Sequence, residues 1–250
     1  MQSSIGLVLD GDGVRRGHAD GGELLELFDL TAGQHGHLLG ALRAMHLEQF
    51  PEHAYAAEEF EHDFAADPHR EGIVVHQWVL CVDGHPVAYS LADSNLIRRV
   101  APMHFLAVAP QARDITVGGR RLGTWFLADT NRQLIEDVGG TALGSVAETP
   151  SYKLPAFLPQ GWQILDPGYP EPVHGWKWPT AGLEIRRIVL LWLPIEVAPI
   201  RTKREVRPAA AAAFLLDMYG VDAADPVFAP LLGAEGQRGG VVRRSAAPLS

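Results

Sequence analysis

The amino-acid sequence predicts an α/β fold in which a β-sheet is flanked by helices. Short apolar runs of strand length alternate with longer amphipathic segments between residues 23 and 195. The dipeptide Asp83-Gly84 separates two of the apolar runs, as in a tight β-hairpin. The segment 124–138 has helical periodicity and ends at Gly139-Gly140, where a helix commonly stops.

The first 66 residues are expected to form a hairpin, a strand and two helices. The hairpin covers 5–16 and turns at Asp10-Gly11-Asp12-Gly13, because these residue types favour tight turns. Residues 17–22 are rich in glycine, aspartate and histidine and are expected to be a linker. The strand is expected at 24–30, and the helices are expected at 31–50 and 56–66.

The next part of the chain is dominated by strands. Besides the helix at 124–138, a short helix or irregular segment is expected at 152–158. The strands are expected at 73–82, 86–91, 101–108, 142–147, 161–165 and 183–193. The complete order is therefore β-α-α-β-β-β-α-β-(α)-β-β.

Three segments are predicted along the chain. Residues 1–22 form an N-terminal hairpin and linker, 23–195 the main domain, and 196–250 a C-terminal extension. Within the extension, the alanine-rich stretch 208–219 predicts a short helix. Residues 233–250 are rich in glycine, alanine, arginine and serine and are expected to be disordered.

Composition narrows the class of protein. The 250 residues carry a net charge of −9, which argues against a nucleic-acid binder. The single cysteine, Cys81, excludes an internal disulfide and suits a reducing compartment. No signal peptide is expected, and the longest apolar run, 188–194, is too short to span a bilayer. A cytoplasmic protein without membrane partners is predicted, and a homodimer is left open.

The most informative stretch begins where the apolar run 103–108 ends. A loop rich in glycine and arginine follows, and then the amphipathic helix begins near Thr124. Free backbone N–H groups and a partial positive charge make a helix N-terminus suitable for anions, and arginines add full charges. The stretch therefore predicts a phosphate or pyrophosphate site, although its glycine spacing matches neither a P-loop nor a dinucleotide fingerprint.

This stretch resembles motif A of the GNAT-type N-acyltransferases. Val108, Pro110 and Arg113 fit the V-x-P-x-x-R part of that motif, and Arg120-Arg121-Leu122-Gly123 fits the R-x-x-G part. Two departures are clear: Arg120 lies seven positions after Arg113, whereas the two halves of the motif normally share one arginine, and Trp125 replaces the final small residue. The order of elements is also that of the family. The resemblance implies a GNAT-like acyl-CoA N-acyltransferase fold with a mixed, splayed sheet.

The resemblance further implies an acyl-CoA co-substrate, most simply acetyl-CoA. Its pantetheine arm would lie between the strands at 103–108 and 142–147. The acyl group would pass by direct attack in a ternary complex to an amine, on a small molecule or a peptide, whose identity the sequence does not reveal. The residues implied in binding the cofactor are Leu106, Ala107, Val108, Arg113, Gly118, Gly119, Arg120, Arg121, Leu122, Gly123 and Thr124.

Three residues are candidates for proton transfer. Glu148, at the end of the strand 142–147, is the first choice as general base, and His104 is the second. In the family a tyrosine often protonates the leaving thiolate, but Phe157 stands at that position of the motif here. Tyr152 is the tyrosine expected to substitute for it.

Two other functions stay open. Phe157 and Trp125 also suit a non-catalytic acyl-CoA-binding protein of the same fold. Alternatively, Asp10 and Asp12 resemble the D-x-D-G motif of magnesium-dependent phosphatases of the haloacid-dehalogenase type. No metal site is predicted from the histidines, His35-Gly36-His37 included, because they lack the spacing of known metal motifs.

Overall fold

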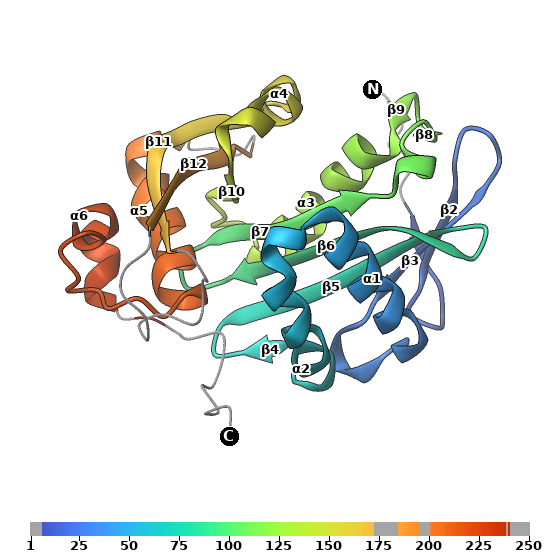
Figure 1. The fold of residues 1–250 in the computed structure, drawn as a ribbon, viewed down its shortest axis with the longest axis horizontal. Coiled ribbons are helices and arrows are strands. Elements are labelled where there is room, and N and C mark those ends of the chain that lie inside the picture. Colours follow the sequence, from blue (N-terminus) through green and yellow to red (C-terminus); the bar gives the residue numbers. More distant parts are fainter. Residues whose placement is uncertain (1–6, 173–184, 196–200, 239, 241–250) are drawn as a thin grey trace. The chain divides into compact units, whose positions relative to one another are not determined.

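The computed structural model describes residues 7–172, 185–195, 201–238 and 240 (Figure 1). It has the predicted α/β class, with a mixed sheet and flanking helices. The chain divides into two compact units, which cut across the three predicted segments. The first comprises residues 1–68, 75–92 and 104–133, and the second comprises residues 69–74, 93–103 and 134–250.

The strands of the first unit follow one another in the order β1 (Val8–Leu9), β2 (Arg15–His18), β3 (Leu24–Asp29), β5 (Ile73–Val82), β6 (His85–Asn95) and β7 (Val100–Val108). The last three also contribute residues to the second unit. Asp83 and Gly84 both have positive φ, 49° and 77°, which confirms the predicted hairpin. The expected linker instead forms the end of β2 and a tight turn, and β2 pairs with β3.

The first unit's helices depart from prediction at two points, because the first parts of the helices expected over 31–50 and 56–66 contain 3₁₀ turns instead of α-helix. The continuous helix expected over 31–50 is wrong, because α1 spans only Leu39–Gln49. Two short 3₁₀ turns precede it, and positive φ at Gly33 (74°) and His35 (53°) prevents a continuous helix. A 3₁₀ segment (Pro51–Glu59) and α2 (Phe60–Ala65) follow, and α3 (Leu122–Val138) lies close to its predicted range.

The second unit contains the mixed part of the sheet. The start of β7 pairs in parallel with β10 (Gly144–Thr149), over Val100–Met103 and Gly144–Ala147. Strand β12 (Ile185–Leu193) is antiparallel to both β10 and β11 (Gln163–Pro172). The two-residue β4 (His69–Arg70) and the one-turn α4 (Leu154–Phe157) complete this part. The predicted splay concerns residues of both units and stays a prediction.

The C-terminal extension forms much of the second unit's core. Helix α5 (Lys203–Ala212) starts five residues before its predicted range, at a capping box between Thr202 and Glu205. A π-helical turn (Ala213–Met218) continues it, and α6 (Ala229–Leu232) and a 3₁₀ turn (Gly233–Arg238) follow. The prediction of disorder over 233–250 is wrong for Gly233–Arg238, which form this 3₁₀ turn. Residues 239 and 241–250 of that stretch lie outside the described residues.

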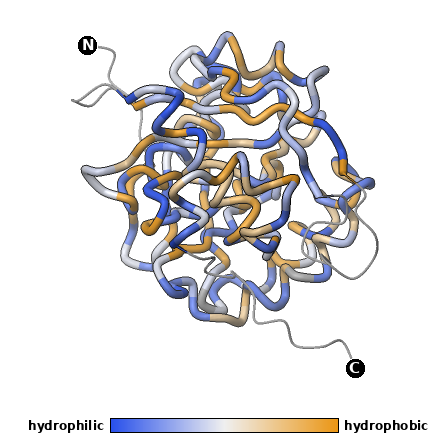
Figure 2. The backbone as a smooth tube through the Cα atoms, turned by 90° about the vertical axis from the view of Figure 1, so that its left-hand side faces the viewer, coloured by the Kyte–Doolittle hydropathy of each residue, from blue (hydrophilic) through white to orange (hydrophobic). Residues whose placement is uncertain are grey.

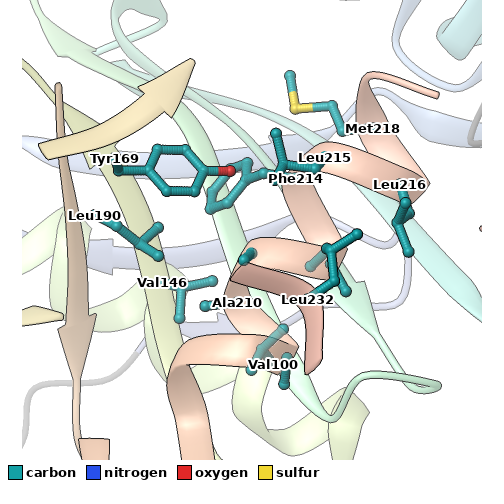
Figure 3. Packing of buried hydrophobic residues seen from close by; sticks show 14 of the residues in the cluster. Val100, Val146, Tyr169, Leu190, Ala210, Phe214, Leu215, Leu216, Met218 and Leu232 are labelled. Carbon is teal, nitrogen blue, oxygen red and sulfur yellow. The ribbon is translucent and has the colours of Figure 1, made fainter. Parts of the chain in front are cut away.

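The core of the second unit lies between the extension and the sheet. Figure 3 shows Val146 and Leu190, from β10 and β12, close to Ala210 and Phe214 of the extension. Tyr169 from β11 lies over the same cluster and is fully buried. Hydrophobic and hydrophilic stretches are interspersed along the chain (Figure 2), and the central strand β5 is buried along its whole length. Among the described residues, no helix is both long and apolar enough to span a membrane.

Candidate functional site

The loop after β7 is held to the protein by Arg113. Its Nε donates a hydrogen bond to the carbonyl of Val108 at 3.2 Å, and its Nη2 donates to Oε1 of Gln49 at 3.2 Å. Arg113 remains exposed, but it already has partners within the first unit. Ala107 is buried, whereas His104, Leu106 and Val108 are half-buried.

A small hairpin explains why Arg120 lies seven positions after Arg113. It consists of β8 (Thr116–Val117) and β9 (Arg120–Arg121), joined by Gly118 and Gly119. Both glycines have positive φ, 59° and 73°, as a two-residue type I′ turn requires. Arg120 and Arg121 are exposed on β9, and neither guanidinium has a hydrogen-bond or ion-pair partner among the described residues.

The turn of this hairpin binds the carboxylate of Asp20, a residue of the same chain. The backbone N–H of Gly118 donates to Oδ1 of Asp20 at 2.8 Å, and that of Gly119 donates to Oδ2 at 2.9 Å. Hydrogen bonds from Gly119, Thr116 and Gly118 lower the pKa of Asp20. The two amides expected to bind pyrophosphate are therefore engaged by Asp20, which lies in the turn between β2 and β3.

The start of α3 offers the remaining donors. The backbone N–H of Leu122 donates to the carbonyl of Ile115 at 2.8 Å. Among the described residues, no acceptor is found for the backbone N–H groups of Gly123 and Thr124, which lie in the first turn of the helix. A Cβ added at Gly123 would lie 3.3 Å from Cγ2 of Val108, so glycine permits the helix start to pack closely against the end of β7.

The predicted base, Glu148, lies in a buried cluster in the second unit. On β10 it shares a sheet face with Val146, and this face is covered by the C-terminal extension. The hydroxyl of Tyr219 donates a short hydrogen bond to Oε2 of Glu148. Oε1 of Glu148 is buried and has no hydrogen-bond partner among the described residues, and neither has the nearby hydroxyl of Tyr169.

The electrostatics of this cluster favour a protonated Glu148. Burial, and next the negative charge of Glu171, raise the pKa of Glu148 well above its usual value. Glu171 itself is paired with Arg186, whose Nε lies 2.6 Å from Oε2 of Glu171. Burial raises the pKa of Glu171 as well, but the charge of Arg186 and its hydrogen bond oppose that rise, so the pKa of Glu148 is the more strongly raised of the two. Burial also raises the pKa of both Tyr169 and Tyr219.

The other candidates for proton transfer are not in this cluster. Tyr152 is 72% exposed, and Nζ of Lys153 lies 6.0 Å from its ring centroid. Phe157 packs edge-on against Trp162, with ring centroids 5.4 Å apart. The catalytic roles of Tyr152 and His104 stay predictions.

Sequence reasoning missed the partners of Glu148, namely Tyr169, Glu171 and Tyr219. One pattern was available: alternation along β10 places Glu148 on the same face as Val146, which indicates burial rather than a solvated strand end. The partners themselves come from β11 and from the C-terminal extension. Only the tertiary fold brings these segments together.

The phosphatase interpretation is not supported. Asp10 and Asp12 are exposed, and both accept hydrogen bonds from Nη1 of Arg16, at 2.8 and 3.1 Å. They lie in the turn of an antiparallel hairpin, β1–β2, at one edge of the sheet. The resembled motif instead requires parallel strands alternating with helices. Among the described residues, no group of three or more acidic, histidine or cysteine side chains could hold a metal ion.

Comparisons with known proteins give similarities of fold at low identity. The sequence matches no protein-family model and no curated protein. The structure is similar to that of Tetrahymena GCN5, with 15% identity, a TM-score of 0.46, and 68% of this chain and 98% of the other covered. It is also similar to the structure of a putative phosphinothricin N-acetyltransferase, with 15% identity, a TM-score of 0.46, and 69% of this chain and 99% of the other covered.

A third similar structure is a Bacillus subtilis acetyltransferase in complex with CoA, with 13% identity, a TM-score of 0.41, and 62% of this chain and 92% of the other covered. Similarities of this size leave the function of the present chain to be argued from its own residues.

Proposed function

We propose that this protein is an acyl-CoA-dependent N-acyltransferase, with acetyl as the simplest acyl group and an amine as the acceptor. One observation carries the proposal. The unpaired guanidinium groups of Arg120 and Arg121 directly precede the start of α3, where the N–H groups of Gly123 and Thr124 have no acceptor within the described chain. Two positive charges and two aligned amides suit a pyrophosphate.

The proposed assignment of the pyrophosphate site is narrower than the one from sequence. Asp20 occupies the N–H groups of Gly118 and Gly119, so we assign binding to Arg120, Arg121, Gly123 and Thr124. In this proposal the hairpin β8–β9 positions the two arginines, and Asp20 holds the hairpin.

The proposed reaction needs a base and a leaving group. Because its pKa is raised, only the ionised fraction of Glu148 can act as the base. The protonated acceptor amine gives one proton to this carboxylate, and the neutral nitrogen then attacks the thioester carbonyl carbon. The C–N bond forms and the C–S bond breaks as the tetrahedral intermediate collapses. The second proton lost by the nitrogen goes to the thiolate of CoA. Glu148 then returns its proton to water, so the products are an amide, CoA thiol and one proton.

Calorimetry of CoA binding tests the cofactor assignment. Charge-assisted hydrogen bonds contribute about 1.5–3 kcal/mol each, so changing Arg120 and Arg121 together to alanine should weaken CoA binding at least about tenfold. The matched control changes Arg43 and Arg204, two exposed arginines elsewhere, to alanine and should leave the affinity nearly unchanged. Equal affinity in the folded Arg120/Arg121 variant and the control would disprove the assignment.

A non-catalytic acyl-CoA-binding protein is the second candidate. It is favoured by Phe157, which has no hydroxyl and packs against Trp162, and by the exposure of Tyr152. Both candidates predict the same CoA binding, so formation of product distinguishes them. Acetyl-CoA incubated with a panel of amines and amine-bearing peptides should release free CoA thiol only if the protein is an enzyme. Glu148→Gln should then lower kcat by about 10²- to 10⁴-fold.

A further inference from the structure

We propose that the C-terminal extension supplies a positioning residue to the acyltransferase site: Tyr219 fixes the carboxyl group of Glu148 and sets its protonation. The inference rests on the proposed function in assigning Glu148 as the base. It adds a residue from outside the segment that resembles the family, which ends near residue 195.

Geometry is the first support. Tyr219 is only 6% exposed, and its hydroxyl donates to Oε2 of Glu148. This bond holds one carboxyl oxygen and leaves the buried Oε1 without a partner among the described residues. A carboxylate held at Oε2 presents Oε1 as the oxygen that can accept a proton from an amine or from a water molecule.

The local backbone places Tyr219 specifically. Tyr219 directly follows a π-helical turn, and its N–H donates to the carbonyl of Phe214 at 2.8 Å, a bond that spans five residues. A π-turn is rarer than an α-turn and is frequent at functional sites. The extra residue in the turn rotates the next residues about the helix axis, so Tyr219 leaves the helix in a direction that an α-helix would not give.

A buried ion pair anchors this turn. The carboxylate of Asp217 accepts hydrogen bonds from Nε and Nη2 of Arg98, each at 3.0 Å, and from Nδ2 of Asn95 at 2.8 Å. Arg98 and Asp217 are each 1% exposed. Because a two-point pair of this kind defines orientation as well as distance, Asp217 fixes the π-turn against the end of β6, and Tyr219 two residues later is fixed with it.

The charges around Glu148 define what the hydroxyl does. Glu171 and Tyr169 from β11, Arg186 from β12 and Tyr219 from the extension face the carboxyl group. Burial, and next the charge of Glu171, raise the pKa of Glu148, whereas the hydrogen bond from Tyr219 lowers it. Tyr219 therefore keeps a larger fraction of Glu148 ionised near neutral pH, in the form that a base requires.

The test uses the whole 250-residue chain and two variants that are expected to move the acidic limb of the pH profile in opposite directions. Tyr219→Phe removes the donor and should move the acidic limb of the kcat/KM profile to higher pH, with a loss of about tenfold at pH 7, as for one hydrogen bond to a charged group. Incorporation of 3-fluorotyrosine at position 219 makes the hydroxyl a stronger donor and should move the limb to lower pH. Tyr89→Phe is the control, because this buried hydroxyl bonds His46 instead, at 2.9 Å.

A second measurement does not depend on activity. The carboxyl carbon of Glu148, followed by ¹³C NMR and assigned with Glu148→Gln, should titrate at higher pH in Tyr219→Phe than in the wild type. If the wild type proves inactive with every amine, the proposed function fails, and this titration still decides the role of Tyr219. If the carboxyl carbon of Glu148 titrates at the same pH in folded Tyr219→Phe as in the wild type, the inference is overturned. If Tyr219→Phe does not fold, an unchanged titration of the same carbon in the 3-fluorotyrosine protein overturns it.

Discussion

The arginine hairpin and the Glu148 cluster place their polar groups in opposite environments, the first in solvent and the second in the protein interior. The hairpin, Thr116–Arg121, is exposed at its turn and second strand, carries unpaired positive charge, and is built from neighbours in the chain. The Glu148 cluster is buried, contains two carboxyl groups, and draws on β10, β11, β12 and the C-terminal extension. An exposed group costs little to leave unpaired, whereas a buried one requires partners. The fold should therefore tolerate mutation of the hairpin more readily than mutation of the cluster.

The largest effect is expected from the buried ion pair that anchors the π-turn. Arg98→Met leaves Asp217 and Glu235 without their buried cation, so the free energy of unfolding should fall by about 3–5 kcal/mol. Denaturation by urea measures the change. The control is Arg43→Met, whose pair with Glu61 is exposed and 3.7 Å long, and which should cost less than about 1 kcal/mol. Similar losses in the two variants would remove the contrast between buried and exposed regions.

Replacing Glu148 should have an intermediate effect on stability, and the direction of its pH dependence follows from the pKa of Glu148. The pKa of Glu148 is higher in the folded state than in the unfolded state. The wild type therefore loses stability as pH rises from the pKa of an unfolded glutamate to the folded pKa of Glu148. Glu148→Gln does not titrate. Its melting temperature relative to the wild type should therefore be higher at pH 8 than at pH 4, by more than about 2 °C, the shift that about 1 kcal/mol produces in a chain of this size.

Thermal unfolding at both pH values decides the point. Glu52→Gln, a change at an exposed glutamate in the first unit, serves as the control and should show no such difference between the two pH values. If the relative melting temperature of Glu148→Gln does not increase with pH, the carboxyl group of Glu148 is not held in the neutral form by the fold.

Features that depend on neighbouring residues could be predicted from the sequence, whereas features that depend on distant residues could not. The turn at Asp83-Gly84, the strand β7 and the helix α3 depend on neighbouring residues; the turn was predicted correctly, and β7 and α3 were predicted nearly to their ends. The second strand of the hairpin, β6, extends four residues beyond its predicted end at residue 91. The helix over 31–50 failed because local glycines and the left-handed His35 outweighed its apolar periodicity.

The partners in both candidate regions could not be predicted, because they are distant in sequence. Asp20 and Gly118 are 98 residues apart, and Glu148 and Tyr219 are 71 apart. The residue types gave each region its chemical character: arginines and glycines indicate an anion, and a carboxylate after a strand indicates a base. Periodicity and turn propensities act over a few residues, so they do not identify which distant side chain completes a site.

The smallest effect is expected at the hairpin turn. Asp20→Ala removes the acceptor of the Gly118 and Gly119 N–H groups, so both amides should exchange their hydrogens faster, while exchange elsewhere stays the same. Amide exchange followed by NMR measures this. Asp10→Ala, which removes an exposed carboxylate paired with Arg16, is the matched control. Slow exchange at both glycines in Asp20→Ala would mean that another group shields this turn.

The place of α5 and the π-turn in the core also bears on how the protein is made. Strands β10, β11 and β12 leave the ribosome before the residues that cover them, because the helical segment begins only at Lys203. Until then, apolar side chains such as Val146 and Leu190 lack the cover that Ala210 and Phe214 provide in the finished core. The second unit should consequently complete its folding only after this helical segment has been synthesised, and a ribosome-bound chain stopped before Lys203 should depend on chaperones to avoid aggregation.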